Sequence, residues 1–555
     1  MDNDAMEIVT AAGMGAIDRD SGERGVPVRV LMENAGAAVA RFCRQRYPGL
    51  PITTLCGKGN NGGDGAVAAR LLAETQTPAK LVLLGSIEDT HGDAADALHR
   101  ARATRGLEFV EAEDEAALRE ALKDAKLILD AVVGTGFKPP LRGLAAVARD
   151  LIAALHVPVI AVDLPSGWDA DSTKETSADD SGVAQAFRAD AVVTFVAPKY
   201  AHVFGHLTPG KTFGSVVVAD IGTPLESIPA HAKMHWTGMA KRIAETPRDV
   251  NGNKGKFGHV LILGGSLGKA GAPSMASLAC MRTGAGLTTA AVPACILPTV
   301  ARVAPELMCA PLEDGLSLDQ LEADGLEKLL KGITVVSIGP GLGQERTIPE
   351  FVRGFVERVS LPMVIDADGL NALAGRTELL KRVAGATDAK GKKRTIVLTP
   401  HPGEMARLVG SSVKEVESDR VELARRFARE HGVTLVLKGW RTLVAHPDGR
   451  IAVNTTGNPG MAKGGSGDIL TGIVAAMLAQ YPDNMAEAVE AAVFLHGLAG
   501  DYATLAQDEH TVLALDTVAH LWRAFRERVT DEDGFTWIAG LAARASRTGG
   551  GGSNA

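Results

Sequence analysis

The chain has few aromatic residues, few cysteines and no long apolar run. Aromatic side chains make up only 4% of its 555 residues. No apolar stretch approaches the ~18 residues needed to span a membrane, so a membrane protein is not expected. The first ten residues, MDNDAMEIVT, are acidic and lack the pattern of a signal peptide.

The cysteines indicate a reducing compartment. Their number is odd and no two form a CxxC pair, so neither a disulfide framework nor a thiolate metal site is indicated. Buried, reduced thiols in a cytoplasmic protein are the simplest interpretation. The five residues are Cys43, Cys56, Cys280, Cys295 and Cys309.

The balance of charge is acidic. The 58 Lys and Arg residues against 66 Asp and Glu residues give a formal net charge of −8. This balance argues against nucleic acid as a partner. Hydrophobic residues make up 46% of the chain and glycine contributes 63 residues. Abundant small and apolar residues suit an α/β fold, in which helices pack closely on parallel strands.

Two halves of the chain each alternate apolar strands with helical stretches, which predicts two mostly parallel sheets covered on both faces. The proline-containing region 223–253 interrupts this alternation and marks the junction. We therefore predict a first domain over 1–228, a second over 229–535 and a flexible tail over 536–555. Within the second domain, 441–457 is expected to form a hairpin that turns at Pro447-Asp448-Gly449.

The most informative segment is 457–472, GNPGMAKGGSGDILTG, which places six glycines around Asp468 and continues as an apolar helix. Glycine lets backbone N–H groups approach an anion, and a helix N-terminus favours phosphate. An acid beside such an anion site is placed to deprotonate a hydroxyl during phosphoryl transfer. A plain strand–helix turn is the structural alternative.

Three segments of the first half carry groups suited to a ligand site. CGKGNNGGDG (56–65) follows a strand and begins a helix. This segment is either a phosphate-binding loop or a tight strand–helix turn in which Asp64 caps the helix. Asp130 precedes VVGTGFKPPLRG (132–143), and DLPSG (163–167) ends another strand. The carboxyl ends of parallel strands meet at one edge of a sheet.

These strand-end groups could bind a cation and a substrate. Asn61, Asp130 and Ser166 offer hard oxygen ligands for a monovalent cation. Asp163 and Lys138 are expected to flank a substrate. Helix capping by Asp163 and Ser166, and a solvated Lys138, are the alternatives.

Together these segments resemble the YjeF-type NAD(P)HX epimerases. Asp18, LMENAG (31–36) and ADAVVTFVAPK (189–199) fit the same family. The resemblance covers about residues 5–225 and implies a Rossmann-like three-layer αβα fold that epimerises C6 of hydrated NADH or NADPH. It implies potassium bound by Asn61, Asp130 and Ser166, and Asp163 and Lys138 as catalytic groups. The residues that would contact the hydrated nucleotide are Asn60, Asn61, Gly62, Gly63, Asp64, Gly134, Thr135, Gly136, Phe137, Lys138, Pro139, Pro140 and Asp163.

The second half has five strand-end motifs besides the segment around Asp468. They combine glycines with acids, a histidine between two prolines, and a lysine near a turn. A glycine turn, a helix cap and a surface lysine are the structural alternatives. The motifs are NKGKFGHVLILGGSLGKAGAPSMAS (253–277), GPGLG (339–343), DADGLN (366–371), TPHPGE (399–404) and LKGWRT (437–442).

In this order the motifs resemble the ADP/ATP-dependent NAD(P)HX dehydratases, a ribokinase-like family of αβα fold. The resemblance spans about 236–525, with Asn253 where the family often has histidine. It implies that Ala272, Gly341, Gly343, His401 and Asp468 face the hydrated dinucleotide. The residues that it assigns to the adenine nucleotide are Lys438, Gly439, Trp440, Arg441, Thr442, Gly464, Gly465, Ser466 and Gly467.

The two resemblances imply a bifunctional enzyme that repairs hydrated nicotinamide nucleotides. The first half would interconvert the R and S epimers of NADHX and NADPHX. The second would dehydrate the S epimer with ADP or ATP and Mg²⁺, with Asp468 as base. ADP is the expected donor, and a homo-oligomer is the expected assembly. The alternative is a small-molecule kinase joined to a non-catalytic binding or dimerisation module, and retention of the potassium and substrate set argues against such a module.

Overall fold

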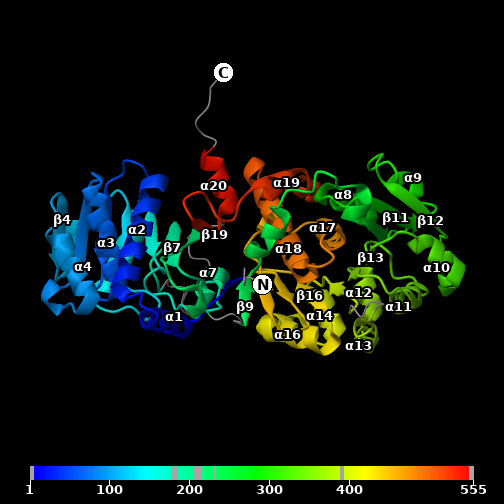
Figure 1. Cartoon of the computed structure of the whole chain (residues 1–555), viewed down its shortest axis with the longest axis horizontal. Helices are drawn as coiled ribbons and strands as arrows, with labels where there is room; N and C mark the ends of the chain where they lie inside the picture. The colour runs from blue at the N-terminus through cyan, green and yellow to red at the C-terminus, as the bar shows by residue number, and fades with distance from the viewer. Residues whose placement is uncertain are drawn as a thin grey trace, which may run out of the picture. The chain divides into compact units, whose positions relative to one another are not determined.

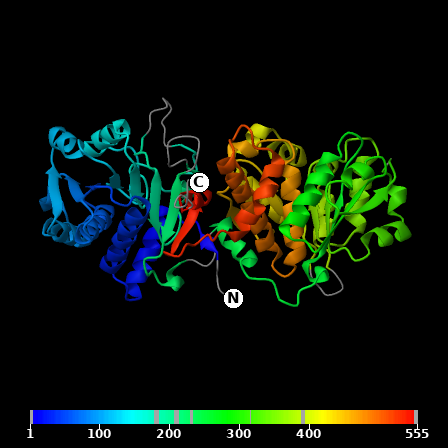
Figure 2. The same ribbon diagram turned by 90° about the horizontal axis from the view of Figure 1, so that it is seen from above.

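The computed structural model describes residues 5–176, 185–205, 214–228, 233–314, 316–387 and 393–548. The chain divides into two compact units (Figures 1 and 2). The first unit contains Met6–Ala232 together with the chain from Val529 onward. The second contains Lys233–Arg528. The chain therefore leaves the first unit, builds the second and returns.

The first unit is built from alternating strands and helices, as predicted. Its strands are β1 (Met6–Glu7), β2 (Ile52–Cys56), β3 (Ala79–Leu84), β4 (Leu107–Ala112), β5 (Ile128–Ala131), β6 (Val159–Val162), β7 (Ala191–Phe195), β8 (Ser215–Ala219) and β19 (Phe535–Ala539). Its helices are α1 (Ala11–Glu23), α2 (Val28–Arg46), α3 (Asn60–Glu74), η1 (Ile87–Asp89), α4 (Gly92–Arg102), α5 (Glu115–Leu122), α6 (Leu144–Ala154), α7 (Tyr200–Phe204), η2 (Leu225–Ser227) and α20 (Leu541–Thr548).

The sheet of the first unit has the strand order β19-β8-β7-β6-β5-β2-β3-β4. From β8 to β4 all neighbours are parallel. The order reverses between β2 and β5, because the chain first adds β3 and β4 on one side and then β5 to β8 on the other. Such a switch point opens a crevice at the carboxyl ends of the two strands.

Helices cover both faces of this sheet. Leu55 of β2 and Ile128 of β5 face a core completed by Leu118 of α5 and Ile152 of α6. On the opposite face α3 approaches so closely that a Cβ on Gly65 would lie 2.4 Å from the Cβ of Ala131. The predicted three-layer αβα arrangement is confirmed.

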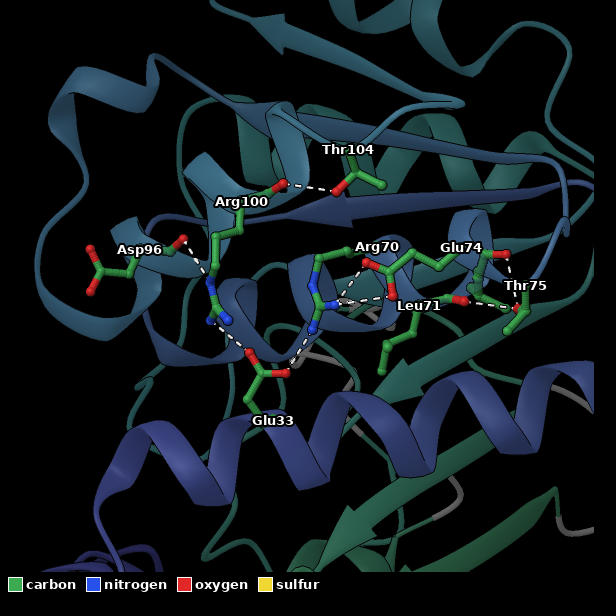
Figure 3. A network of polar contacts seen from close by, with 9 residues as sticks. Glu33, Arg70, Leu71, Glu74, Thr75, Asp96, Arg100 and Thr104 are labelled. Atoms are coloured by element: carbon green, nitrogen blue, oxygen red, sulfur yellow. Dashed lines mark hydrogen bonds and ion pairs between the residues drawn. The ribbon is translucent and has the colours of Figure 1, made fainter.

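A network of ion pairs fastens the three helices α2, α3 and α4 to one another (Figure 3). Glu33 of α2 forms ion pairs with Arg70 of α3 at 2.6 Å and with Arg100 of α4 at 2.6 Å. Arg70 also pairs with Glu74 on its own helix at 2.9 Å. Because Arg70 is mostly buried, its two carboxylate partners offset the cost of removing its charge from water.

The C-terminal segment differs from the prediction. Residues 536–555 were expected to be a flexible tail, yet β19 pairs antiparallel with β8 and α20 follows it. This red strand lies at the edge of the first unit's sheet (Figures 1 and 2). Alternating apolar residues around Trp537 pack on Phe42, which local composition alone did not reveal. Residues 549–555 lie outside the described part of the chain.

The second unit repeats the alternation of strands and helices. Its strands are β9 (Met234–Trp236), β10 (His259–Leu263), β11 (Leu287–Pro293), β12 (Met308–Leu312), β13 (Val335–Ile338), β14 (Met363–Ile365), β15 (Ile396–Leu398), β16 (Thr434–Leu437), β17 (Leu443–Ala445) and β18 (Ile451–Val453). Its helices are η3 (Thr237–Ala244), η4 (Lys254–Phe257), α8 (Gly271–Thr283), α9 (Leu297–Val300), η5 (Leu318–Leu321), α10 (Ala323–Leu330), α11 (Ile348–Arg358), α12 (Asp368–Leu373), α13 (Glu378–Ala384), α14 (Pro402–Val409), α15 (Val413–Ser418), α16 (Arg420–His431), η6 (Pro459–Met461), α17 (Ser466–Gln480), α18 (Met485–Ala506) and α19 (Ala514–Arg526).

The strands of the second unit follow the order β9-β18-β17-β16-β15-β14-β13-β10-β11-β12. From β12 to β16 all neighbours are parallel, and β17 and β18 form the predicted antiparallel hairpin. The order reverses between β10 and β13, which opens a crevice at their carboxyl ends. Helix α17, buried along most of its length, packs against this part of the sheet.

None of the helices in the described ranges is both long and apolar enough to cross a membrane.

Candidate active sites

The first unit has a cavity of about 520 Å³ at the switch point between β2 and β5. The predicted glycine loops contribute to it because both follow the ends of these strands. Eight predicted residues line the cavity together: Asn60, Asn61, Asp64, Gly134, Thr135, Gly136, Phe137 and Asp163. The expected convergence of these segments is present in the fold.

Gly62 and Gly63 have a different position. They lie in the first turn of α3 and do not line the cavity. A Cβ on Gly62 would lie 1.9 Å from the carbonyl oxygen of Gly57, and one on Gly63 would lie 2.7 Å from the Met32 Sδ atom. Because these two residues lack a side chain, α3 can begin in close contact with Gly57, directly after β2, and with Met32 of α2.

Lys138 also lies apart from the cavity lining. Its Nζ atom bonds Asp169 at 2.7 Å and Asp171 at 3.1 Å, and its side chain is 58% exposed. Pro139 and Pro140 follow it, joined by a cis peptide bond, and likewise do not line the cavity. The ion pairs with Asp169 and Asp171 anchor the loop after β5, so Lys138 is a loop anchor in this conformation.

The three predicted potassium ligands surround the loop that follows β5. Ser166 donates its hydroxyl to Oδ1 of Asp130 at 2.6 Å and its N–H to Oδ2 at 2.8 Å. Burial raises the pKa of Asp130 to about 6, although the bonds from Ser166 oppose this shift. The amide oxygen and nitrogen of Asn61 are both buried and have no hydrogen-bond partner in the described chain. A buried amide oxygen without a partner, together with the oxygens of Asp130 and Ser166, is a donor set of the kind that suits a hard monovalent cation.

Besides Lys58, whose ammonium is bound to Asp89, two further charged residues line this cavity: Asp18 from α1 and Lys199, which follows β7. Sequence reasoning used both as family markers and gave them no chemical role. Lys199 is 1% exposed and donates to Oδ1 of Asp163 at 2.8 Å. Its place at the carboxyl end of a strand was the available signal, because such strand ends meet at the crevice.

In the second unit, the glycine-rich segment forms a loop that ends at the N-terminus of α17. Gly465 caps this helix with φ +95°, a conformation that favours glycine. Asp468 lies in the first turn. Burial raises its pKa to about 6, the nearby Asp366 raises it further, and Lys438 opposes both. A carboxyl group with this pKa beside a helix N-terminus suits a general base near neutral pH.

Lys438 lies close to several carboxylates and to the glycine-rich segment before Asp468. Its Nζ atom is 3.1 Å from Oδ1 of Asp366 and 3.8 Å from Oε2 of Glu404. Burial alone would lower the pKa of Lys438, but Asp366, Glu404 and Asp468 together raise it. A Cβ on Gly467 would lie 3.2 Å from this ammonium. Lys438 is therefore a fixed positive charge next to the predicted phosphate site.

The comparisons with known proteins divide the chain into the same two parts. Residues 28–201 match the YjeF-related protein N-terminus, and residues 260–521 match the NAD(P)H-hydrate dehydratase family. The bifunctional NAD(P)H-hydrate repair enzyme of Moorella thermoacetica is 39% identical over 542 residues, which cover 94% of this chain and 98% of that protein. The corresponding enzyme of Escherichia coli is 35% identical over 518 residues, covering 92% of each.

The chain belongs to the family of bifunctional NAD(P)H-hydrate repair enzymes. Its first unit is the epimerase unit and its second is the dehydratase unit. The crystal structure of the ADP/ATP-dependent NAD(P)H-hydrate dehydratase of Bacillus subtilis, co-crystallised with ATP and Mg²⁺, is 31% identical and covers 52% of this chain and 96% of its own, with a TM-score of 0.43. The family assignment favours the repair enzyme over the kinase alternative.

In the dehydratase unit, the first turn of α8 and the loop after β13 bring Ala272, Gly341 and Gly343 together. A Cβ on Gly341 would lie 3.0 Å from the Cβ of Ala272. Ser266 donates its hydroxyl to the Gly341 carbonyl at 2.9 Å, and the N–H of Gly343 donates to Oδ2 of Asp368 at 2.8 Å. The left-handed backbone at both glycines lets these segments pass close to one another.

His401 caps the N-terminus of α14. Its Nδ1 atom accepts the N–H of Gly403 at 3.0 Å, and Glu404 accepts the N–H of His401 at 2.8 Å. The imidazole is 53% exposed at the carboxyl edge of the sheet. The cap fixes the ring, and its exposure leaves it open to a ligand.

The segment Lys438–Thr442 forms a tight turn after β16. Arg441 has φ +51°, is buried, and donates to the Thr455 carbonyl at 2.8 Å. Its guanidinium carbon lies 4.4 Å from the centre of the Trp440 ring. Arg420 donates to the Lys438 carbonyl at 3.1 Å. These bonds hold the partly buried Trp440 ring on this turn, where it offers a stacking surface for a base.

Proposed function

We propose that the epimerase unit interconverts the R and S epimers at C6 of hydrated NADH and NADPH. The dehydratase unit then returns the S epimer to NADH or NADPH and converts ADP into AMP and phosphate. The observation that carries the proposal is Asp468 in the first turn of α17, preceded by the glycine-rich segment Gly464–Gly467, with the ammonium of Lys438 beside Gly467. This arrangement combines a base with an anion site, which dehydration through phosphoryl transfer requires.

In the dehydratase unit, Asp468 takes the proton of the C6 hydroxyl, and the hydroxyl oxygen attacks the terminal phosphoryl group of the nucleotide. Backbone N–H groups of Gly464–Gly467 and the ammonium of Lys438 stabilise the charge that develops on that group. Phosphate then leaves C6, driven by the lone pair of ring nitrogen N1, and loss of a proton from C5 restores the reduced ring. Magnesium, which arrives with the nucleotide phosphates, supplies charge neutralisation.

The nucleotide site is proposed at Lys438, Gly439, Trp440, Arg441, Thr442 and the glycine-rich loop with Ser466. The turn after β16 supports this placement, because it carries both Trp440 and Lys438, whose ammonium lies beside Gly467. Ala272, Gly341, Gly343 and His401 are proposed to bind the hydrated dinucleotide. ADP is the proposed donor in preference to ATP.

Potassium is the proposed metal of the epimerase unit, held by Asn61, Asp130 and Ser166. The orphaned buried amide of Asn61 supports this assignment. The ion would supply a fixed positive charge beside the loop 134–137. Replacing Asn61 with Ala should abolish the rise in melting temperature of the epimerase unit that KCl, compared with tetramethylammonium chloride, gives the parent protein.

The decisive experiment uses the purified protein and an epimeric mixture of NADHX with K⁺ and Mg²⁺. Absorbance of the reduced nicotinamide is followed with ADP, with ATP and with neither. Complete recovery of NADH that depends on one nucleotide supports both activities and identifies the donor. Recovery that stops at the S fraction would remove the epimerase assignment.

A stable phosphorylated product instead of NADH would favour the kinase alternative.

We also propose that the enzyme works in the cytoplasm as a homo-oligomer. Light scattering coupled to size exclusion measures the assembly. The free thiols of all five cysteines are compatible with a reducing compartment.

A further inference from the structure

The cavity of the epimerase unit holds three carboxyl groups and a buried ammonium. Asp18 comes from α1, Asp64 from α3, Asp163 follows β6 and Lys199 follows β7. They come from four separate elements and converge on one space of about 520 Å³. None of them belongs to the proposed potassium ligands. Their convergence calls for a chemical role in the inversion of C6.

Asp163 has the environment of an ionised carboxylate. Its Oδ1 atom accepts bonds from Lys199 Nζ at 2.8 Å and from the Thr194 hydroxyl at 2.8 Å. Burial alone would raise the pKa of Asp163, but Lys199, with His202 and Thr194, lowers it below the ordinary value. No group in the described chain donates to the Oδ2 atom. Asp163 therefore has a free oxygen that is able to accept a proton.

Asp64 has the opposite environment. No described residue forms a hydrogen bond or an ion pair with its carboxyl group. Burial raises its pKa well above the ordinary value, and Asp163 and Asp18 raise it further, while Lys199 opposes them. Lys58 also lines the cavity, but its ammonium is bound to Asp89 at 2.6 Å.

Asp18 completes the group. Burial raises its pKa and the neighbouring Asp163 adds to this effect, whereas Lys199 and Arg19 oppose it. The single buried ammonium is bonded to Asp163 and not to Asp18 or Asp64. Environments that push two carboxyl groups to opposite protonation states are typical of an acid and base pair. Asp64, which has no bonded partner in the described chain, therefore has the environment of a protonated acid, and Asp163, bonded to Lys199, that of an ionised carboxylate.

Inversion at C6 needs one bond at this carbon to break and form again. C6 carries a hydroxyl group and is bonded to ring nitrogen N1. When a base takes the hydroxyl proton, the C6–N1 electron pair moves to N1, which receives a proton from an acid. C6 becomes an aldehyde and turns about the C5–C6 bond. N1 then adds to the other face, and both protons return, so no oxidant or co-reactant is needed.

We propose that Asp163 is the base and Asp64 the acid of this ring opening, and that Lys199 is a positioning residue that keeps Asp163 ionised. This proposal rests on the proposed epimerase function. Loss of hydroxide from C6 would instead leave a cationic ring beside carboxylates, which would take the C5 proton and release NADH in this unit. Ring opening keeps the oxygen on C6, so dehydration remains confined to the other unit.

The test uses the full chain, purified R-NADHX and K⁺ without any nucleotide, so that the dehydratase unit is silent. Formation of the S epimer is followed by chromatography. Asp64→Asn and Asp163→Asn should each slow it by about 10²- to 10⁴-fold. Dehydration of S-NADHX with ADP should stay unchanged in both variants. The thermal transition of the epimerase unit, matched to the parent protein, controls for its folding.

The pH profile separates the roles. In the parent protein the rate should fall as pH rises through the raised pKa of Asp64, because the acid loses its proton. Compared with Asp64→Asn, the Asp64→Glu variant should recover part of the rate. Its rate should again fall as pH rises, as in the parent protein. Lys199→Met removes the cation that lowers the pKa of Asp163, so the acidic limb should move to higher pH.

Two results would overturn the proposal. The first is an Asp64→Asn variant that keeps the parent rate and the same alkaline limb. The second is uptake of one ¹⁸O from labelled water at each inversion, since ring opening retains the hydroxyl oxygen. A parent protein that dehydrates S-NADHX but never inverts R-NADHX would instead defeat the proposed epimerase function on which the inference rests.

Discussion

Nζ of Lys438 lies 3.1 Å from Oδ1 of Asp366, and the other oxygen of Asp366 accepts the hydroxyl of Thr471 at 2.8 Å. Thr471 belongs to α17, the helix whose first turn carries Asp468. Asp366 therefore joins the ammonium to the helix that presents the base. Both the charge of Lys438 and the position of Asp468 depend on this buried carboxylate.

Replacing Asp468 with Asn should slow dehydration of S-NADHX by about 10²- to 10⁴-fold, because the amide cannot take the hydroxyl proton. Epimerisation of R-NADHX, measured without nucleotide, should keep the parent rate. Asp324→Asn, which changes an exposed acid of the same unit, is the matched control. Normal dehydration by Asp468→Asn would disprove the assignment of the base.

Dehydration should also depend on pH through Asp468. The base must be ionised, and its pKa is raised to about 6, so kcat should fall as pH drops below this value. Lys438 lowers the pKa of Asp468, so Lys438→Met should move this limb to higher pH as well as weaken nucleotide binding. Lys328→Met, which removes an exposed lysine of the same unit, is the control. An unchanged midpoint in Lys438→Met would show that the two charges are not coupled.

A buried carboxylate outside the active sites should control acid stability. Oε1 of Glu490 on α18 accepts bonds from His235 at 2.9 Å and from His446 at 2.8 Å. Burial alone would raise the pKa of Glu490, but the two histidines lower it to about 2. Its folded-state pKa is depressed, so its contribution is present above the ordinary value of 4.5 and is lost as pH falls toward 2.

Glu490→Gln should therefore lower the free energy of unfolding of the dehydratase unit at pH 7 by about 3–5 kcal/mol, as expected when one partner of a buried ionic cluster is removed. The difference from the parent should shrink at low pH. Urea unfolding at pH 7 and pH 3 measures it, with the exposed Glu327→Gln as the control. A constant difference at both pH values would contradict the linkage.

The returning strand β19 should stabilise the epimerase unit. Trp537 is buried, packs on Phe42 with ring centres 6.4 Å apart, and donates to Oδ2 of Asp531 at 2.8 Å. Trp537→Ala should cost about 3–5 kcal/mol. Epimerase activity should then be lost at a lower temperature than in the parent, while dehydratase activity keeps its thermal midpoint.

The control for this strand is Trp522→Ala, since Trp522 is 57% exposed on α19 of the dehydratase unit. That variant should leave the thermal midpoint of epimerisation unchanged. Equal loss of both activities on heating Trp537→Ala would show that β19 does not act through the epimerase unit alone.

The α/β class, the two domains and the strand-end motifs could be predicted from local sequence. Continuous apolar strands followed by glycine turns specify parallel sheets, and the switch points then bring Asn61 and Asp163, or Ala272 and Gly341, to one edge. The assignment of Lys138 to the substrate is not supported by the same logic. Lys138 pairs with Asp169 and Asp171, which follow β6 and not β5, so the local sequence around Lys138 did not reveal these partners.

The sequence by itself determined which chemical groups stand at the ends of the strands, because apolar periodicity and glycine turns act over a few residues. Only the tertiary structure decided that the pKa of Asp64 is raised and that of Asp163 is lowered. Asp64 and Asp163 are residues of the same type. Lys199, which is distant in sequence from Asp64, donates to Asp163 and not to Asp64. It likewise decided that Phe535–Ala539 is a strand, because its partner β8 precedes it by hundreds of residues. Burial and ion pairing depend on such distant neighbours, which no local pattern contains.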